Sequence, residues 1–159
     1  MVAETQRSCG GCTACCKALP VFEIHKPAGQ QCPQCNEGVG CRIYSTRPKP
    51  CREFICQWLM GYGEDSERPD LIEIVPDYEE IEGLGKVFFL WEVSEGTLDG
   101  PHGQEMVKRA IHNEIPVCHI YCTGERKLYV PKGLNISERE LQVHAGDNCH
   151  VFIVSSTPP

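Results

Sequence analysis

The sequence predicts an α+β fold, in which an irregular, cysteine-rich N-terminal half packs on a small, mainly antiparallel sheet with one or two helices. Two observations lead to this prediction. Nine of the twelve cysteines lie in the first sixty residues, where hydrophobic periodicity is sparse. The later residues contain short segments typical of strands and one segment with the apolar stripe of an amphipathic helix.

Length and charge indicate one protein with two unlike parts. At 159 residues, the chain is long enough to bury an ordinary hydrophobic core. Residues 1–60 carry seven Lys and Arg against four Asp and Glu, a formal +3, whereas residues 61–159 carry eight against eighteen, a formal −10. We expect a cysteine-cluster region at 1–60 and an α+β region at 61–159, as two units or one continuous domain. The polar, turn-forming segment at 61–69 (GYGEDSERP) is the candidate linker.

Little regular structure is expected before the linker. Residues 18–24 (ALPVFEI) favour a short strand, and residues 26–30 (KPAGQ) favour a loop. Residues 50–60 (PCREFICQWLM) favour a helix because their apolar side chains have helical spacing. These side chains are Phe54, Ile55, Trp58 and Leu59.

After the linker, the pattern is that of ordinary α+β structure. Residues 71–75 (LIEIV) and 86–93 (KVFFLWEV) favour strands, and residues 77–85 (DYEEIEGLG) favour an acidic connection between them. Residues 101–114 favour a helix, and 116–131 favour a hairpin around a TGER turn. A capped short helix at 137–141 and a last strand at 149–154 complete the expectation. The predicted apolar stripe of the long helix consists of Met106, Val107, Ala110 and Ile111.

The distribution of cysteines is the main indication of function. Four of them occur together in residues 9–16 (CGGCTACC), where two glycines allow a tight turn, and a second C-x2-C pair follows at 32–35. Cysteines at this spacing can direct their sulfurs at one ion, as in zinc knuckles and iron–sulfur loops. The candidate metal ligands are Cys9, Cys12, Cys15, Cys16, Cys32, Cys35, Cys41, Cys51 and Cys56.

A disulfide framework is the competing interpretation, because twelve is an even number and small secreted domains are often cross-linked. The first residues, MVAETQRSCGG, contain no apolar segment of the kind found in a signal peptide, so we expect a reducing, cytoplasmic location. The adjacent pair Cys15–Cys16 and the two C-x2-C units are also poor partners for structural bridges. Metal binding is therefore favoured over disulfides.

Three stretches together resemble a known family. The run CGGCTACC, the segment KPAGQQCPQC and the segment GCRIYSTRPKPCREFICQWL are similar to the YkgJ-like CxxCxxCC proteins, described as zinc- or iron-chelating domains. The similarity covers residues 9–59. By position, the resemblance implies metal ligands at Cys12, Cys15, Cys16, Cys32, Cys41 and Cys51, followed by Cys56.

The identity of the metal stays open at this point. Nine thiols can supply two ZnS4 sites with one thiol left over, one [4Fe–4S] cluster with five left over, or a shared multinuclear zinc cluster. The vicinal cysteine pair and the number of thiols favour zinc over iron. We expect a zinc-holding structural or interaction module, and an iron–sulfur or iron-dependent redox or modifying enzyme is the alternative. Whether the chain is an enzyme is left undecided.

The expected partners are the metal ion and a protein partner. No apolar run reaches the roughly 20 residues that span a bilayer, and an acidic chain is unsuited to nucleic acid. The basic side chains near the cysteines instead offset the negative charge of bound thiolates. They are Lys17, Arg42, Arg47, Lys49 and Arg52. Either Arg47 or Arg52 is expected to hydrogen-bond to sulfurs or to hold the turn through carbonyl oxygens.

The remaining cysteines and histidines have a simpler interpretation. Cys118, Cys122 and Cys149 belong to or adjoin the later strands and are expected to be small buried hydrophobes, with a second metal site as the alternative. We expect His119 and His150 on the opposite face of those strands. The surface candidates are His102, His112 and His144, whereas His25 is close enough in sequence to replace one thiolate.

Overall fold

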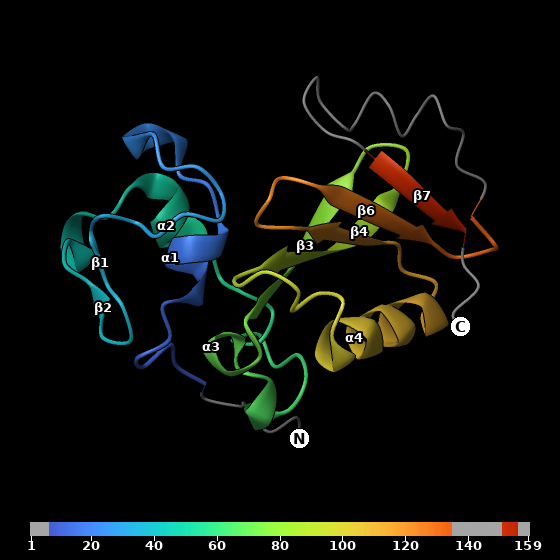
Figure 1. Cartoon of the computed structure of the whole chain (residues 1–159), viewed down its shortest axis with the longest axis horizontal. Helices are drawn as coiled ribbons and strands as arrows, with labels where there is room; N and C mark the ends of the chain where they lie inside the picture. The colour runs from blue at the N-terminus through green and yellow to red at the C-terminus, as the bar shows by residue number, and fades with distance from the viewer. Residues whose placement is uncertain (1–6, 135–150, 156–159) are drawn as a thin grey trace.

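The computed structural model describes residues 7–134 and the backbone of a strand at 151–155 (Figure 1). The predicted helix at 137–141 and the residues Cys149, His144 and His150 lie outside the described residues. Short elements occupy one side of Figure 1, and a sheet with one long helix occupies the other. Within the described residues, no helix is both long and apolar enough to cross a bilayer.

The N-terminal half contains only short elements. Two are helices of five residues, α1 (Ala14–Ala18) and α2 (Lys49–Glu53). Two are strands of two residues, β1 (Cys35–Asn36) and β2 (Gly40–Cys41), which pair with each other. Single 3-10 turns lie at Phe22–Ile24 and Tyr44–Thr46. The expectation of an irregular cysteine-rich half is confirmed.

A mixed sheet forms the second half. Its strands are β3 (Ile74–Ile81), β4 (Gly85–Glu92), β5 (Val117–Ile120), β6 (Arg126–Val130) and β7 (Val151–Ser155), in that spatial order. The pairs β3–β4 and β5–β6 are antiparallel, whereas β4–β5 and β6–β7 are parallel. The predicted α+β class is confirmed, as are the strand at 86–93, the hairpin and the last strand.

The helix α4 (Pro101–His112) covers one face of this sheet (Figure 1). Its residues Met106, Val107 and Ala110 are buried with Phe88 and Leu90, and Ile111 packs against the same cluster, so the predicted apolar stripe is confirmed. The cysteine-rich half docks elsewhere on the sheet. There, the buried Ala14 and Ala18 of α1 form a cluster with Val75 of β3 and with Val93, which follows β4.

Two expected elements of the N-terminal half are wrong. Residues 18–24 do not form a strand, because Ala18 ends α1 and the following chain turns back on itself until Val21 pairs with Lys26 in an isolated bridge. The helix expected at 50–60 ends at Glu53. Beyond it, the backbone N–H of Gln57 donates to the carbonyl oxygen of Pro76, so tertiary contact with β3 replaces continued helix.

The start of the sheet also differs from expectation. Residues 71–75 are not one strand, because the helix α3 (Pro69–Ile72) begins at a proline and comes first. The acidic connection at 77–85 is mostly strand, since β3 continues to Ile81. Its exposed Glu80 lies opposite Lys86 of β4, and this opposite-charge pairing favours the acidic strand.

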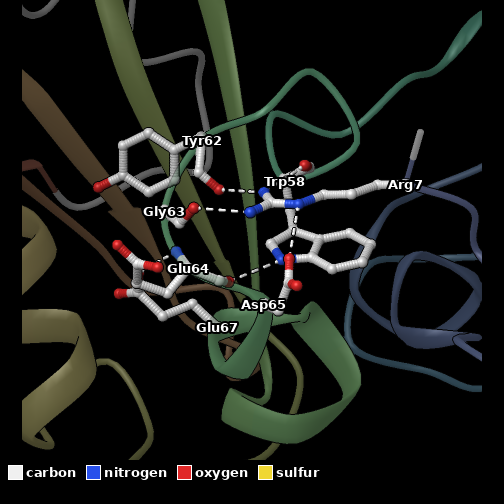
Figure 2. Close-up of polar contacts among 7 residues, drawn as sticks. All are labelled: Arg7, Trp58, Tyr62, Gly63, Glu64, Asp65 and Glu67. Atoms are coloured by element: carbon white, nitrogen blue, oxygen red, sulfur yellow. Dashed lines mark hydrogen bonds and ion pairs between the residues drawn. The ribbon is translucent and has the colours of Figure 1, made fainter. Parts of the chain in front are cut away.

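Residues 58–67 fold around one arginine (Figure 2). The Arg7 guanidinium donates to the carbonyl oxygens of Trp58, Tyr62 and Gly63 at 2.8–2.9 Å and bonds Asp65 at 3.1 Å. It also lies over the Trp58 ring, 4.7 Å from its centroid. Glu67 of the adjacent 3-10 turn at Asp65–Glu67 pairs with Arg109 of α4. The segment expected to be a linker is thus tied to residues on both sides of it.

Candidate metal centre

Six of the nine predicted ligands come together from several short elements. α1 supplies two of them, the loop after it supplies one, and β1, β2 and α2 supply one each. The pairing of β1 with β2 sets Cys35 directly opposite Cys41, and the backbone N–H of Cys32 donates to the carbonyl oxygen of Cys16 at 3.0 Å. We call this set the Cys16 cluster; it consists of Cys15, Cys16, Cys32, Cys35, Cys41 and Cys51.

The turn that contains Gly10 and Gly11 packs closely against the turn between β1 and β2, and the lack of side chains on glycine allows this contact. Gly10 has a φ of +53°, and a Cβ on Gly11 would lie 2.6 Å from the carbonyl oxygen of Gly38. The N–H of Gly38 in turn donates to the Thr13 hydroxyl at 3.1 Å. The CGGC turn is therefore seated against the turn between β1 and β2, and the predicted need for glycine there is met by both residues.

Cys16 lies at the centre of the cluster. Its thiol interacts with the thiols of Cys15 and Cys35. The interaction with Cys15, followed by burial, raises the pKa of Cys16 well above its ordinary range. Burial and the neighbouring Cys16 raise the pKa of Cys35 to about 11. Burial, Cys16 and Cys32 likewise raise the pKa of Cys51. Without a cation, these thiols oppose one another's ionisation, whereas a bound metal ion would reverse that effect.

A buried lysine lies beside the sulfurs. The side chain of Lys26 is only 4% exposed, and its ammonium donates to the carbonyl oxygen of Lys17 at 2.8 Å and to that of Leu19. Burial lowers its pKa, while nearby Cys32 and Cys16 act in the opposite direction. Lysine is almost never buried without a partner. In this position, the Lys26 ammonium group can offset the negative charge of neighbouring thiolates.

Sequence reasoning missed Lys26. It lies in the segment 26–30 that was expected to be a solvated loop, and no periodicity marks it as buried. The expectation that Arg47 holds the turn through carbonyl oxygens is confirmed. Its guanidinium donates to the carbonyl oxygen of Tyr44 at 3.0 Å and to that of Cys51 at 3.5 Å. Arg52 is exposed on α2.

The other three predicted ligands form a second set, which we call the Cys56 group: Cys9, Cys12 and Cys56. The backbone N–H of Cys12 donates to the carbonyl oxygen of Cys9 at 2.8 Å. Cys12 and Cys56 pack against the apolar cluster between α1 and β3. Burial raises the pKa of Cys12 to about 11, and it raises that of Cys56, which is also affected by Cys9 and Asp77.

The nine candidate ligands are all free thiols. Within the described residues, no three His, Cys, Asp or Glu side chains converge with the geometry of a metal site. The chemistry of the donors nevertheless fits a soft metal ion, because several thiols act on one another around Cys16 and a thiolate is a soft ligand.

The later cysteines and histidines lie apart from these sets. Cys118 is buried in an apolar cluster on the sheet, as predicted, whereas Cys122 is half-buried in the turn after β5. His102, His112 and His25 are exposed. His119 is fully buried on β5.

Comparisons with models of protein families, with curated proteins and with solved structures found no match for this chain. The similarity to YkgJ-like proteins therefore rests on the cysteine motifs and stays a proposal.

Proposed function

We propose that this protein binds zinc through its N-terminal cysteines and that the metal holds this half of the chain together as a structural or interaction module in the cytoplasm. The observation that supports it most directly is the Cys16 cluster. Four separate segments of chain bring six thiols together beside a buried ammonium group. Zinc is bound by four such thiolates in closed structural sites.

The scarcity of apolar core in this half supports a structural role for the metal. Among residues 7–60, the buried apolar side chains are few, and most of them are small: Ala14, Ala18, Val21, Cys35 and Trp58. Larger apolar side chains of the same half, such as Phe22 and Tyr44, are exposed. A region this poor in buried area needs another source of stability, and structural zinc contributes about 10 kcal/mol or more to small domains. The sheet, with its own core, is the part available to a protein partner.

Iron is the alternative metal for the same donors. An iron–sulfur cluster or an iron-dependent redox or modifying site would use four of the thiols and leave the others unliganded. The two proposals differ in what the isolated protein contains. Zinc gives a colourless, redox-silent protein, whereas a cluster gives a brown protein that absorbs near 400 nm.

Elemental analysis and absorbance of the anaerobically purified full chain test the proposal. We expect zinc bound in proportion to protein, no visible colour and no paramagnetic signal after reduction by dithionite. Iron bound in proportion to protein, together with a paramagnetic signal near g of about 2, would support the iron alternative and contradict the zinc proposal. A protein that binds neither metal after reconstitution under reducing conditions would contradict both.

Cysteine variants separate ligands from core residues. Cys16→Ser should lower bound zinc, because a hydroxyl is a much poorer ligand than a thiolate, whereas Cys118→Ser should retain it. Removal of the metal by a chelator should speed amide exchange in residues 9–56 and leave the sheet protected. Unchanged exchange in 9–56 after verified metal removal would refute the structural role.

A further inference from the structure

We infer that the Cys56 group and the carboxylate of Asp77 form a second metal site of three sulfurs and one oxygen, separate from the Cys16 cluster. This inference rests on the proposed function and assigns ligands within it. Asp77 lies on β3, which had been expected to be an acidic connection, and it was not among the predicted ligands. The chemical class of the ligand is a divalent ion that accepts both thiolate and carboxylate, such as zinc.

The arrangement of β3 places Asp77 on the correct side of the sheet. Alternate residues of a strand face opposite ways. Ile74 and Tyr78 pack in the core beneath α4, whereas Val75 packs in the cluster that includes Cys12 and Cys56. Asp77 shares the face of Val75, and its charge acts on the Cys56 thiol. The hydrogen bond from Gln57 N to Pro76 O, 2.9 Å long, fixes the chain next to Cys56 against the chain next to Asp77.

The sulfurs of this group are surrounded as metal-bound thiolates are. The backbone groups of Leu59 and Trp58 lie close to the sulfur of Cys56 and act on it electrostatically. The backbone groups of Ala14 and Asp70 do the same for Cys12. Backbone groups close to sulfur are also a feature of the surroundings of metal-bound thiolates.

Asp77 is a better donor to this site than its neighbour Asp70. The carboxylate of Asp70 is held by the Arg68 guanidinium through two bonds, of 2.6 and 2.8 Å. One Asp77 oxygen accepts the N–H of Tyr78 at 2.9 Å, and within the described residues the other has no hydrogen-bond partner. Asp77 is half-buried and has no ion pair within the described residues, whereas Asp70 is paired with Arg68. A metal ion would supply the missing positive charge.

The two sets of sulfurs are distinct by their neighbours. The main electrostatic partners of Cys16 are Cys15, Cys35 and Lys26, whereas those of Cys56 are Cys9 and Asp77. Cys9 is exposed, so the second site has one ligand at the surface. As they stand, the side chains do not close around a point, and the ion must draw them together. We therefore expect this site to exchange metal faster than the Cys16 cluster.

Titration of the reduced, metal-free full chain with Co²⁺ tests the inference. Thiolate-to-cobalt absorbance counts the sites and reports the number of sulfurs at each. We expect Asp77→Asn to weaken one class of site about tenfold or more and leave the other unchanged. Asp77→Cys should restore tight binding with one more thiolate in the spectrum, a gain that a merely structural role would not produce. Glu79→Gln is the matched control, since Glu79 is exposed two residues along β3 and its change should alter nothing.

Cysteine variants complete the test. Cys56→Ser should remove the class of site that Asp77→Asn weakens, and Cys16→Ser should remove the other. If Cys56→Ser and Cys16→Ser abolish the same sites, the sulfurs form one shared cluster and the inference is wrong. If Asp77→Asn matches the unaltered chain in affinity and spectrum, Asp77 is not a ligand. A chain that binds no Co²⁺ or Zn²⁺ at all would refute the proposed function itself.

Discussion

A buried histidine makes the stability of the sheet depend on pH. His119 on β5 is fully buried, and its Nε2 has no hydrogen-bond partner within the described residues. Its Nδ1 lies 3.4 Å from the Tyr121 hydroxyl, which donates to Asp99 at 2.8 Å. Burial lowers the pKa of His119 from 6.5 to about 4. Asp99 acts to raise this pKa, and Lys127 acts to lower it.

The sign and size of the effect follow from proton linkage. Between pH 6.5 and about 4, the unfolded chain binds a proton at His119 that the folded protein does not bind, so stability falls as pH falls through this range. Above pH 6.5 both states are neutral, and the penalty is absent. One pKa unit corresponds to about 1.4 kcal/mol, so the loss approaches about 3 kcal/mol at the lower limit and is about 2 kcal/mol at pH 5.

Urea unfolding of the full chain and of His119→Gln at pH 7.5 and pH 5 measures this loss. The variant removes the titrating group, so the stability of the unaltered protein relative to the variant should fall by about 2 kcal/mol between the two pH values. Other titrating groups, including Glu67, remain in both proteins and cancel. His112→Gln, at the exposed end of α4, should show no such difference. Parallel pH profiles for His119→Gln and the unaltered chain would refute the reasoning.

Two further predictions concern the attachment of α4. Arg109→Gln should destabilise the protein by about 2 kcal/mol in thermal unfolding, because the nearly buried Glu67 carboxylate loses its ion pair and the hydrogen bond that lowers its pKa. Gly103→Ala should also destabilise it by about 2 kcal/mol or more, although alanine favours helix. A Cβ at Gly103 would lie 2.1 Å from the carbonyl oxygen of Leu98, so the helix would have to move.

Lys108→Ala serves as the control for both changes, because Lys108 lies on the exposed side of the same helix. It should alter stability by no more than about 0.5 kcal/mol. If Gly103→Ala is as stable as Lys108→Ala, the close approach to Leu98 does not constrain the helix. If Arg109→Gln is neutral, the Glu67 carboxylate is adequately solvated without its partner.

The sequence predicted elements best where one periodicity dominates. The stripe of α4 and the apolar run of β4 both follow a single rule, and both are found close to the expected bounds. The errors lie where distant contacts decide the outcome. The chain after Glu53 has helical spacing, but Gln57 bonds to β3 and Trp58 donates to Glu64 O at 3.0 Å, so the helix stops. No local pattern reveals such a partner.

The site shows a similar limit. Spacing identified the nine cysteines as candidates, but it left open how they are grouped, since a pair such as Cys12 and Cys15 can serve one ion or two. The grouping depends on the orientation of α1 and β3. The hydrophobic pattern did not predict that the acidic residues after Pro76 belong to strand β3. Neither Lys26 nor Asp77 was among the predicted site residues, because each lies in a segment whose composition is typical of a loop or connection. Tertiary structure buries Lys26 near the cysteines and places Asp77 on β3.

Strand β3 connects the two halves through its opposite faces. Ile74 and Tyr78 belong to the core under α4, which holds large buried side chains. Val75 belongs to the cluster with Ala14 and Ala18 of α1, where the buried apolar side chains are small. If the chain binds metal as proposed, its removal should loosen α1 and the cysteine loops while the face with the larger buried side chains stays packed. The sheet would then remain a folded platform on which the cysteine-rich half could order again when metal returns.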